Sequence, residues 1–264
     1  MHWSYDVSVT SVASLVTAIA NRTQPDNAAA WDPVGLQLGD PRSSVESVAV
    51  CHEVTEAVVE ALESRPVDLL VTYHPLLFEP TNRILSGRSA EARAYALIRL
   101  GVNLLVTHTD FDAAPGGTAD ALASMLSLRD LTAFGGDPKS GLPDIGRHGE
   151  FEATLAVLDA LVSDSFGSTG IRITGDRSRD LNRVAVIPGS GSDYVLAASE
   201  VADALVTGDV PHHTTVRAAD LGLCIVDPGH TATERPGMKA LVDMIGELVD
   251  VTEDLTHLDP KTWT

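Results

Sequence analysis

Apolar positions along the chain follow two alternating periods. In five segments they recur every three to four residues, which predicts amphipathic helices: 11–22, 56–65, 91–101, 118–126 and 238–249. Short apolar runs between them predict buried strands: 47–54, 67–74, 102–110, 181–189, 203–209 and 222–227. Residues 146–164 have the pattern of a further strand followed by a helix. Strands that alternate with helices predict largely parallel sheets with helices packed on their faces.

The length of 264 residues fits one large domain or two ordinary ones. Residues 128–144 are rich in glycine, proline and aspartate, which predicts loops and makes this segment the best candidate for a domain boundary. No stretch approaches the length of a membrane span. The first ten residues lack a basic segment followed by an apolar one, so we expect no secretion signal.

The two cysteines, Cys51 and Cys224, both lie in apolar runs. This placement is typical of small buried side chains rather than of a disulfide framework. Together with the missing leader pattern, it predicts an intracellular, cytoplasmic protein.

The composition is strongly acidic, with 37 Asp and Glu against 18 Lys and Arg and a formal charge of −19. This balance argues against a nucleic-acid surface, because phosphate contacts need clustered Lys and Arg. Two explanations remain: an acidic face for a basic partner, or a halophilic surface whose self-repulsion is screened by high salt. We favour the halophilic surface, because the acidic residues are spread along the whole chain.

Imidazoles and carboxylates follow three of the predicted strands. They are His74 after the first, His108, Asp110 and Asp112 after the second, and Asp227, His230 and Glu234 after the third. In open α/β sheets, ligands bind beyond the carboxyl ends of strands. His230 and Glu234 are four residues apart, so they share a face if that turn is helical. This mix of donors suits a divalent ion such as Zn, Mn, Fe or Co.

Each of these residues also has a purely structural explanation. A lone histidine after a strand is commonly a hydrogen-bonded packing residue, Asp112 could cap a turn, and Glu234 before Arg235-Pro236 could favour a helix N-terminus. If residues 108–112 are extended, Asp110 points to the opposite side from Asp112, but a bend could bring Asp110 or His108 inward. The coincidence of three strand ends nevertheless favours a metal site.

Two further segments leave alternatives open. The glycine-rich turn at 189–193 could present N–H groups to a phosphate, or it could be a plain turn with Ser192 or Asp193 as a helix N-cap. His212 and His213 could contact a substrate or could merely start a helix.

Seven segments, in the same order along nearly the whole chain, resemble the dinuclear-metal-centre family known as GTP cyclohydrolase 1 type 2. They are WDPVGLQLGD (31–40), YHPLLF (73–78), HTDFDAAPGG (108–117), GRHGE (146–150), GSGSD (189–193), LVTGDVPHH (205–213) and GHTATERPG (229–237). In that family two metals lie in an α/β domain, and a late glutamate bridges them. The resemblance implies that the metal ligands here are His74, Asp112, His230 and Glu234.

The resemblance also implies a domain arrangement. The first two implied ligands lie in the first half of the chain and the last two near its end, so the chain must leave the metal-binding domain and return. We expect two α/β domains, with residues 1–126 and 227–264 forming the metal-binding domain and 127–226 a smaller inserted one. The family further implies a toroidal homohexamer whose metal sites face an internal cavity.

Tyr73 departs from the family pattern, which has a histidine there that binds the ion also held by the aspartate. A phenol has an unperturbed pKa of about 10 and binds well only if the metal lowers that value. We therefore expect a firm site at His74, His230 and Glu234 and a weaker one at Asp112 and Glu234. Tyr73 would hydrogen-bond a metal-bound water, with direct phenolate ligation as the alternative.

With these ligands we expect metal-assisted hydrolysis, in which two ions bridged by Glu234 activate a shared water. His108, near the ligands but outside the set, could orient that water or move a proton. The family name implies hydrolytic opening of the guanine imidazole ring of GTP, with release of formate. The alternative is a non-catalytic metal-binding ring that serves as a scaffold or adaptor. Polar groups around an open coordination position would favour the hydrolase, and a large apolar patch outside the ring would favour the scaffold.

Overall fold

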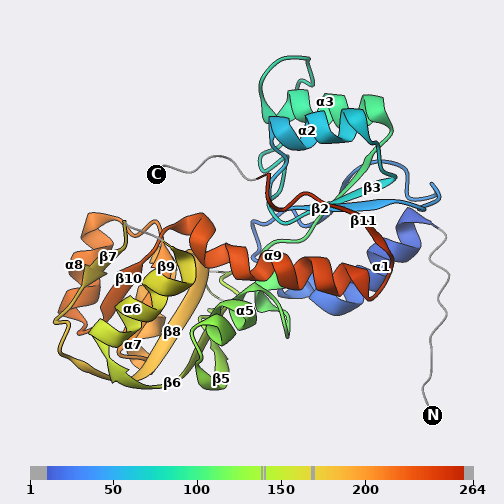
Figure 1. Ribbon diagram of the computed structural model, residues 1–264. Coiled ribbons are helices and arrows are strands. Elements are labelled where there is room, and N and C mark those ends of the chain that lie inside the picture. Colours follow the sequence, from blue (N-terminus) through green and yellow to red (C-terminus); the bar gives the residue numbers. More distant parts are fainter. Residues whose placement is uncertain (1–10, 138, 140, 168–169, 259–264) are drawn as a thin grey trace, which may run out of the picture. The chain divides into compact units, whose positions relative to one another are not determined.

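The computed structural model describes residues 11–137, 139, 141–167 and 170–258. It divides into two compact units. The first comprises Met1–Pro25, Asp32–His108 and Leu241–Thr264, and the second comprises Asp26–Trp31 and Thr109–Ala240. Each unit has its own β-sheet with helices (Figure 1), which confirms the predicted α/β class.

The sheet of the first unit has the strand order β1-β4-β3-β2-β11 within the described residues. Its strands are β1 (Gly35–Leu38), β2 (Val48–Cys51), β3 (Leu69–Thr72), β4 (Asn103–Val106) and β11 (Val251–Asp254). All neighbouring pairs are parallel except β1 with β4. The four residues of each of β2, β3 and β4 are all buried, as expected for parallel strands covered on both faces.

Each of three helices of the first unit begins at a residue whose side chain caps it with a hydrogen bond. They are α1 (Val12–Thr23), α2 (Glu56–Ser64) and α3 (Ala90–Leu100), and η1 (Pro25–Asn27) follows α1. Ser11, Thr55 and Ser89 each accept a hydrogen bond from a backbone N–H of the first turn. Figure 1 shows α2 and α3 on one face of the sheet and α1 on the other.

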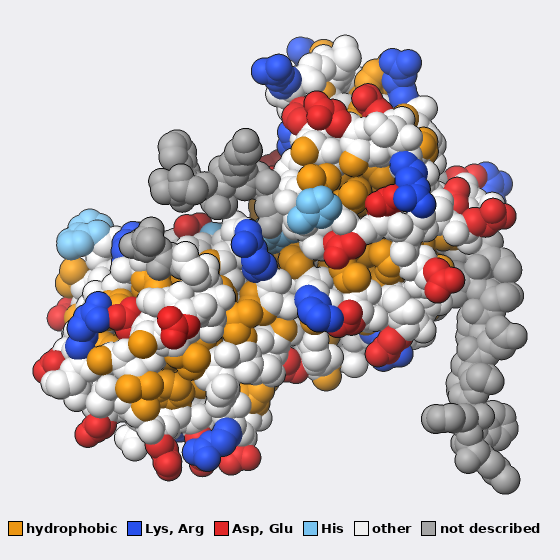
Figure 2. Space-filling model, viewed as in Figure 1, with side chains coloured by type: hydrophobic (Ala, Val, Ile, Leu, Met, Phe, Trp, Pro, Cys, Tyr) orange, Lys and Arg blue, Asp and Glu red, His pale blue; other side chains and the backbone are white. Residues whose placement is uncertain are grey.

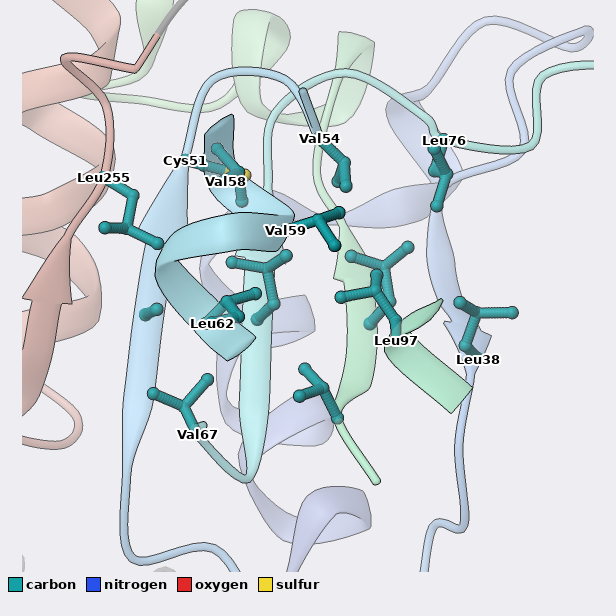
Figure 3. Packing of buried hydrophobic residues seen from close by; sticks show 14 of the residues in the cluster. Leu38, Cys51, Val54, Val58, Val59, Leu62, Val67, Leu76, Leu97 and Leu255 are labelled. Atoms are coloured by element: carbon teal, nitrogen blue, oxygen red, sulfur yellow. The ribbon is translucent and has the colours of Figure 1, made fainter. Parts of the chain in front are cut away.

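Aliphatic side chains of α2 and α3 interdigitate with the sheet (Figure 3). Val58, Val59 and Leu62 of α2 and Leu97 of α3 pack in one buried cluster, which also contains Leu255 beyond the end of β11. Each of these large side chains withdraws enough apolar area from water to contribute about 1.5–3 kcal/mol to stability. The packing holds the three central strands, and therefore the residues at their ends, in fixed register.

The sheet of the second unit is mixed. Its order is β5-β6-β8-β9-β10-β7 in the part of the chain described, and only β8, β9 and β10 are mutually parallel. The strands are β5 (Arg129–Phe134), β6 (Gly146–Thr154), β7 (Arg172–Thr174), β8 (Asp180–Ser190), β9 (Ala204–Gly208) and β10 (Cys224–Asp227).

Helices cover both faces of this second sheet. They are α4 (Thr109–Ala113), α5 (Thr118–Met125), α6 (Leu155–Phe166), α7 (Val195–Val201) and α8 (His212–Asp220), with η2 (Ser192–Tyr194) before α7. Val184 and Val186 of β8 share a cluster with side chains of α5 and α6. Ala185 and Ile187 share another with side chains of α7 and α8. Successive residues of one strand thus supply both cores.

Helix α9 (His230–Gly246) is continuous along the chain from the second unit into the first, and the division falls between Ala240 and Leu241. It begins eight residues before the predicted start at residue 238, with Pro236 in its second turn. Pro236 has no N–H to donate to the carbonyl of Ala232, four residues earlier, so the helix lacks that hydrogen bond. In the first turn, the Thr233 hydroxyl donates to the carbonyl of His230 at 2.7 Å.

The two units divide the chain at other points than the predicted domain boundaries of 126/127 and 226/227. Helix α5 and strand β10 pack in the core of the second sheet and so belong to the second unit. Within the predicted loop segment 128–144, residues 129–134 form β5, so that part of the prediction was wrong. No helix in the described residues has the length and apolar character needed to cross a membrane. Both cysteines are buried and neither forms a disulfide, as predicted.

Candidate metal centre

The first unit gathers histidines at the carboxyl ends of its three central strands. His52 follows β2, Tyr73 and His74 follow β3, and His108 follows β4. Backbone pairing continues past the strand ends, since the N–H of Tyr73 donates to the carbonyl of Cys51 at 3.1 Å and that of His74 to the carbonyl of His52 at 2.9 Å. The register of parallel strands therefore places these side chains at one edge of the sheet, as the sequence predicted.

The rings of these residues form a compact cluster. The ring centroids of His52 and His74 are 4.8 Å apart, and those of His74 and His108 are 5.2 Å apart. Tyr73 lies 5.0 Å from His74 and 5.3 Å from His108, and only 1% of it is exposed. The donor nitrogens of His52 and His74 lie within 4.8 Å of each other, a separation that one metal ion could span.

His108 has a buried carboxylate as its neighbour. Its Nδ1 lies 3.0 Å from Oδ2 of Asp32, whose side chain is fully buried. A carboxylate beside one imidazole nitrogen fixes the orientation of the ring and leaves the other nitrogen for chemistry. Asp32 lies in the WDPVGLQLGD segment, so this pair connects two of the motifs.

In the second unit, His230 and Glu234 lie one turn apart at the start of α9, which confirms that they share a helix face. His230 Nε2 is 2.9 Å from Glu234 Oε1, and Glu234 is 2% exposed. His230 Nδ1 is 2.9 Å from Oδ2 of Asp209. Burial disfavours the charged imidazole, but the hydrogen bonds and charges of Glu234 and Asp209 outweigh it and raise the pKa of His230 to about 9.

The glycine-rich end of β8 and the residues that follow it close against this pair. Gly189 has a φ of +63°, and a Cβ there would lie 2.5 Å from Glu234 Oε1 and 3.2 Å from His230 Nε2. Its N–H donates to the Thr233 hydroxyl at 2.9 Å. The N-cap alternative was wrong, because the helix after this turn has Tyr194 at its N-cap position. The sequence GSGSD is explained by a backbone that must approach the His230–Glu234 pair closely.

Asp110 and Asp112 lie in helix α4, whereas the predicted strand ran on to residue 110, so the end of that strand prediction was wrong. Both are buried, at 1% and 3% exposure. Asp110 accepts a hydrogen bond from the N–H of Phe111 at 2.9 Å. Burial, followed by the negative charge of Asp112, raises the pKa of Tyr194, so that phenol stays protonated at neutral pH.

The five site residues predicted from the sequence therefore fall in two groups. His74 and His108 belong to the first unit, and Asp112, His230 and Glu234 belong to the second. His212 and His213 are the first two residues of α8. The sequence interpretation missed His52, Asp32 and Asp209. His52 carried a usable signal, because it ends its strand as His74 and His108 do.

Residues that could hold a metal ion are His52 and His74 of the first unit and Glu234 of the second. Imidazole nitrogen and carboxylate oxygen are the donors that zinc and related divalent ions prefer. The donor types present therefore fit a metal centre.

Comparisons with known proteins show which family the chain resembles. A family model described as Duf34/NIF3 (NGG1p interacting factor 3) matches residues 10–259. A protein of Streptomyces coelicolor named GTP cyclohydrolase 1 type 2 homolog is 32% identical over 249 residues, covering 90% of this chain and 87% of its own. A protein of the same name from Lactococcus lactis is 34% identical over 204 residues, covering 75% and 77%.

Solved structures share the fold at lower identity. A Bacillus cereus protein related to NIF3 has a TM-score of 0.85 at 20% identity, covering 97% of this chain and 99% of its own. Reduced HcgD from Methanocaldococcus jannaschii has a TM-score of 0.79 at 24% identity, covering 93% and 97%.

Proposed function

The chain belongs to the Duf34/NIF3 family, and from this membership and its two ligand clusters we propose that it is a divalent-metal-dependent hydrolase. Its ligands would be His74, Asp112, His230 and Glu234, with Glu234 shared by two ions and His52 as an additional nitrogen donor beside His74. The observation that carries the proposal is the His230–Glu234 pair, held 2.9 Å apart with the carboxylate buried. A buried carboxylate needs a cation or hydrogen bonds to compensate its charge; in the metal-free protein His230 supplies them, and a bound metal ion would take over that part.

When bound, two such ions would lower the pKa of a water and polarise the bond it attacks. The protein's own part would lie with His108. Asp32 beside its Nδ1 orients the ring, so the other nitrogen can accept a proton from the attacking water and return it to the leaving group. Tyr73, buried against both rings, would donate a hydrogen bond to a water of the weaker site.

The substrate class comes from the relatives. Their name, GTP cyclohydrolase 1 type 2 homolog, supports a purine nucleotide whose imidazole ring is opened by water with release of formate. A chain of charge −19 repels a triphosphate, so metal ions would have to offset that repulsion. We further propose that the chain assembles into a homohexameric ring, which light scattering would detect as a particle of about six chain masses.

Metal analysis of the purified protein tests the ligand set first. We expect two ions per chain in the wild type and almost none in Glu234→Ala, because this residue would bridge both. Glu234→Gln keeps the side-chain volume and should lose metal as well, whereas His257→Ala, at an exposed position, should keep both ions. Unchanged metal content in both Glu234 variants would end the proposal.

Formate release from GTP, followed with and without chelator, tests the activity. We expect a chelator-sensitive rate in the wild type. His108→Asn should lower it by roughly 10²–10⁴-fold, which is the usual contribution of general acid–base catalysis, while both ions stay bound. Full metal content without turnover of GTP or related nucleotides would favour the scaffold or adaptor function instead.

A further inference from the structure

Asp209 occupies a backbone conformation that few residues adopt. It follows β9 directly and has a φ of +55°, one of four non-glycine residues with positive φ in the described ranges. The left-handed region costs an L-residue roughly 1–2 kcal/mol, somewhat less for aspartate. Such outliers persist where the surrounding structure holds them, and they concentrate at functional sites.

The carboxylate of Asp209 has one prominent partner. Its Oδ2 lies 2.9 Å from Nδ1 of His230, although 61% of its side chain is exposed. The opposite ring nitrogen, Nε2, lies 2.9 Å from Glu234 Oε1. An exposed ion pair adds little to stability, so folding alone gives no reason to keep an aspartate in this costly conformation.

Buried contacts lock the backbone around Asp209 to the start of α9. A Cβ on Gly208 would lie 2.5 Å from the backbone nitrogen of His230, so the two segments touch. The buried carboxylate of Asp227 accepts from the N–H of Val210 at 3.1 Å and from that of Gly229 at 2.9 Å. Val210, which follows Asp209, and Gly229, which precedes His230, are thus both bound to the side chain of Asp227, and this fixes the distance between the two segments.

We propose that Asp209 is a positioning residue, which holds the proton of His230 on Nδ1 and so presents Nε2 as the metal-binding nitrogen. A metal-bound histidine commonly donates its other N–H to a carboxylate, and losing that partner typically costs 10–100-fold in metal affinity. This inference rests on the proposed metal centre. The competing explanation is a plain turn residue, because aspartate tolerates positive φ better than most residues.

The two explanations separate in Asp209→Gly and Asp209→Asn. Glycine adopts the same φ without strain and removes the carboxylate, whereas asparagine keeps an acceptor and removes the charge. Competition of Zn²⁺ between apo-protein and a chromophoric chelator measures affinity, and thermal unfolding of the apo-protein measures stability. We expect Asp209→Gly to lose about 10–100-fold in affinity with no loss of melting temperature, and Asp209→Asn to lose less.

Asp130→Gly is the matched control, because Asp130 is an exposed aspartate of the same unit with a φ of +49°. It should leave zinc affinity unchanged. Equal affinity of Asp209→Gly and the wild type, or an affinity loss matched by a fall in melting temperature, would overturn the positioning role.

An NMR experiment on metal-free, histidine-labelled protein decides the matter even if the wild type binds no zinc. In the wild type the Nδ1-bound proton of His230 should give a resolved signal, protected from solvent exchange by Asp209. Asp209→Gly should lose this signal, and Asp130→Gly should keep it. Failure of zinc binding in the wild type would count against the metal centre, whereas persistence of the signal in Asp209→Gly would count against Asp209.

Discussion

At the scale of single residues, the candidate centre is packed so closely that substitution of one side chain should alter its geometry. Gly189 is the clearest case, since its missing side chain makes space for the carboxylate of Glu234. Tyr73 is another, because its buried phenol ring lies against the imidazoles of both His74 and His108. Each position yields a prediction that a single substitution can test.

Gly189→Ala should disturb the centre through two separable effects. Positive φ costs alanine about 1–2 kcal/mol, and its Cβ would push on Glu234 as well. Gly222→Ala is the control, since Gly222 has a φ of +74° and open space around it. Both variants should lose stability in thermal unfolding, but only Gly189→Ala should lose metal affinity, on the order of tenfold. Equal affinities in the two variants would contradict the close-approach role.

Tyr73→His should tighten only the weaker of the two proposed sites. A metal ligand must be deprotonated. Imidazole is already largely neutral at pH 7, whereas a phenol, with an unperturbed pKa of about 10, must first lose its proton. Calorimetric titration of metal into apo-protein should show two affinities in the wild type and a smaller gap in the variant. Two equal, tight sites in the unmodified protein would rule out the asymmetric pair.

At the scale of secondary-structure elements, strands carry the polar contacts that connect the motifs. The GRHGE segment is the start of β6, and its Arg147 is buried and donates to the carbonyls of Ala113 and Gly146, both at 2.9 Å. His148 on the same strand accepts from Arg183 of β8, with Nε and Nη2 at 3.1 and 2.9 Å from its Nδ1. Because Nδ1 of His148 accepts these hydrogen bonds, it carries no proton.

His148 makes the stability of the second unit depend on pH. Burial first, and the charge of Arg183 second, hold its pKa below the usual 6.5. The unfolded chain therefore binds the proton more readily than the folded one, so this stability is present above about pH 6.5 and declines as the pH falls below it. His148→Gln keeps an acceptor for Arg183 without titrating. Between pH 7 and 5 its melting temperature should fall less than that of the wild type, and parallel curves would exclude this role.

At the scale of the whole molecule, the excess of acid is the dominant property. Acidic side chains on the face in Figure 2 are scattered among neutral and basic ones rather than gathered in one patch. A dispersed negative charge opposes compaction through self-repulsion, and salt relieves it. This face shows no single acidic patch, and the halophilic surface stays a prediction.

The melting temperature should therefore rise steeply between dilute buffer and about 1 M KCl, as the screening length falls from about 10 Å at 0.1 M to about 3 Å. The rise should flatten once the screening length is shorter than the spacing between charges. Preferential exclusion by sulfate continues to strengthen with concentration, so a sulfate series serves as the comparison. Equal stability in dilute buffer and in molar KCl would revive the idea of a basic partner.

Local pattern in the sequence was sufficient for the elements and for part of the centre. The periods of apolar residues predicted α1, α2, α3 and α5 and the central strands, because burial of one face or of both faces leaves a direct trace in the order of residues. The strand-end rule led to His74, His108 and His230, since parallel strands present their last residues at a common edge.

Other features depend on residues that are distant in sequence and adjacent only after folding. No periodic pattern in the sequence marks the pairing of Asp32 with His108 or of Asp209 with His230. His52 lies beside His74 because β2 and β3 are neighbours in the sheet. The helical turn that carries Asp112 was missed because it has only five residues, too few to show a helical period. Sequence by itself determined which faces are buried and where polar groups end strands. Tertiary structure alone decided which of those groups meet, because strand order and backbone contacts, not sequence spacing, fix the distances between them.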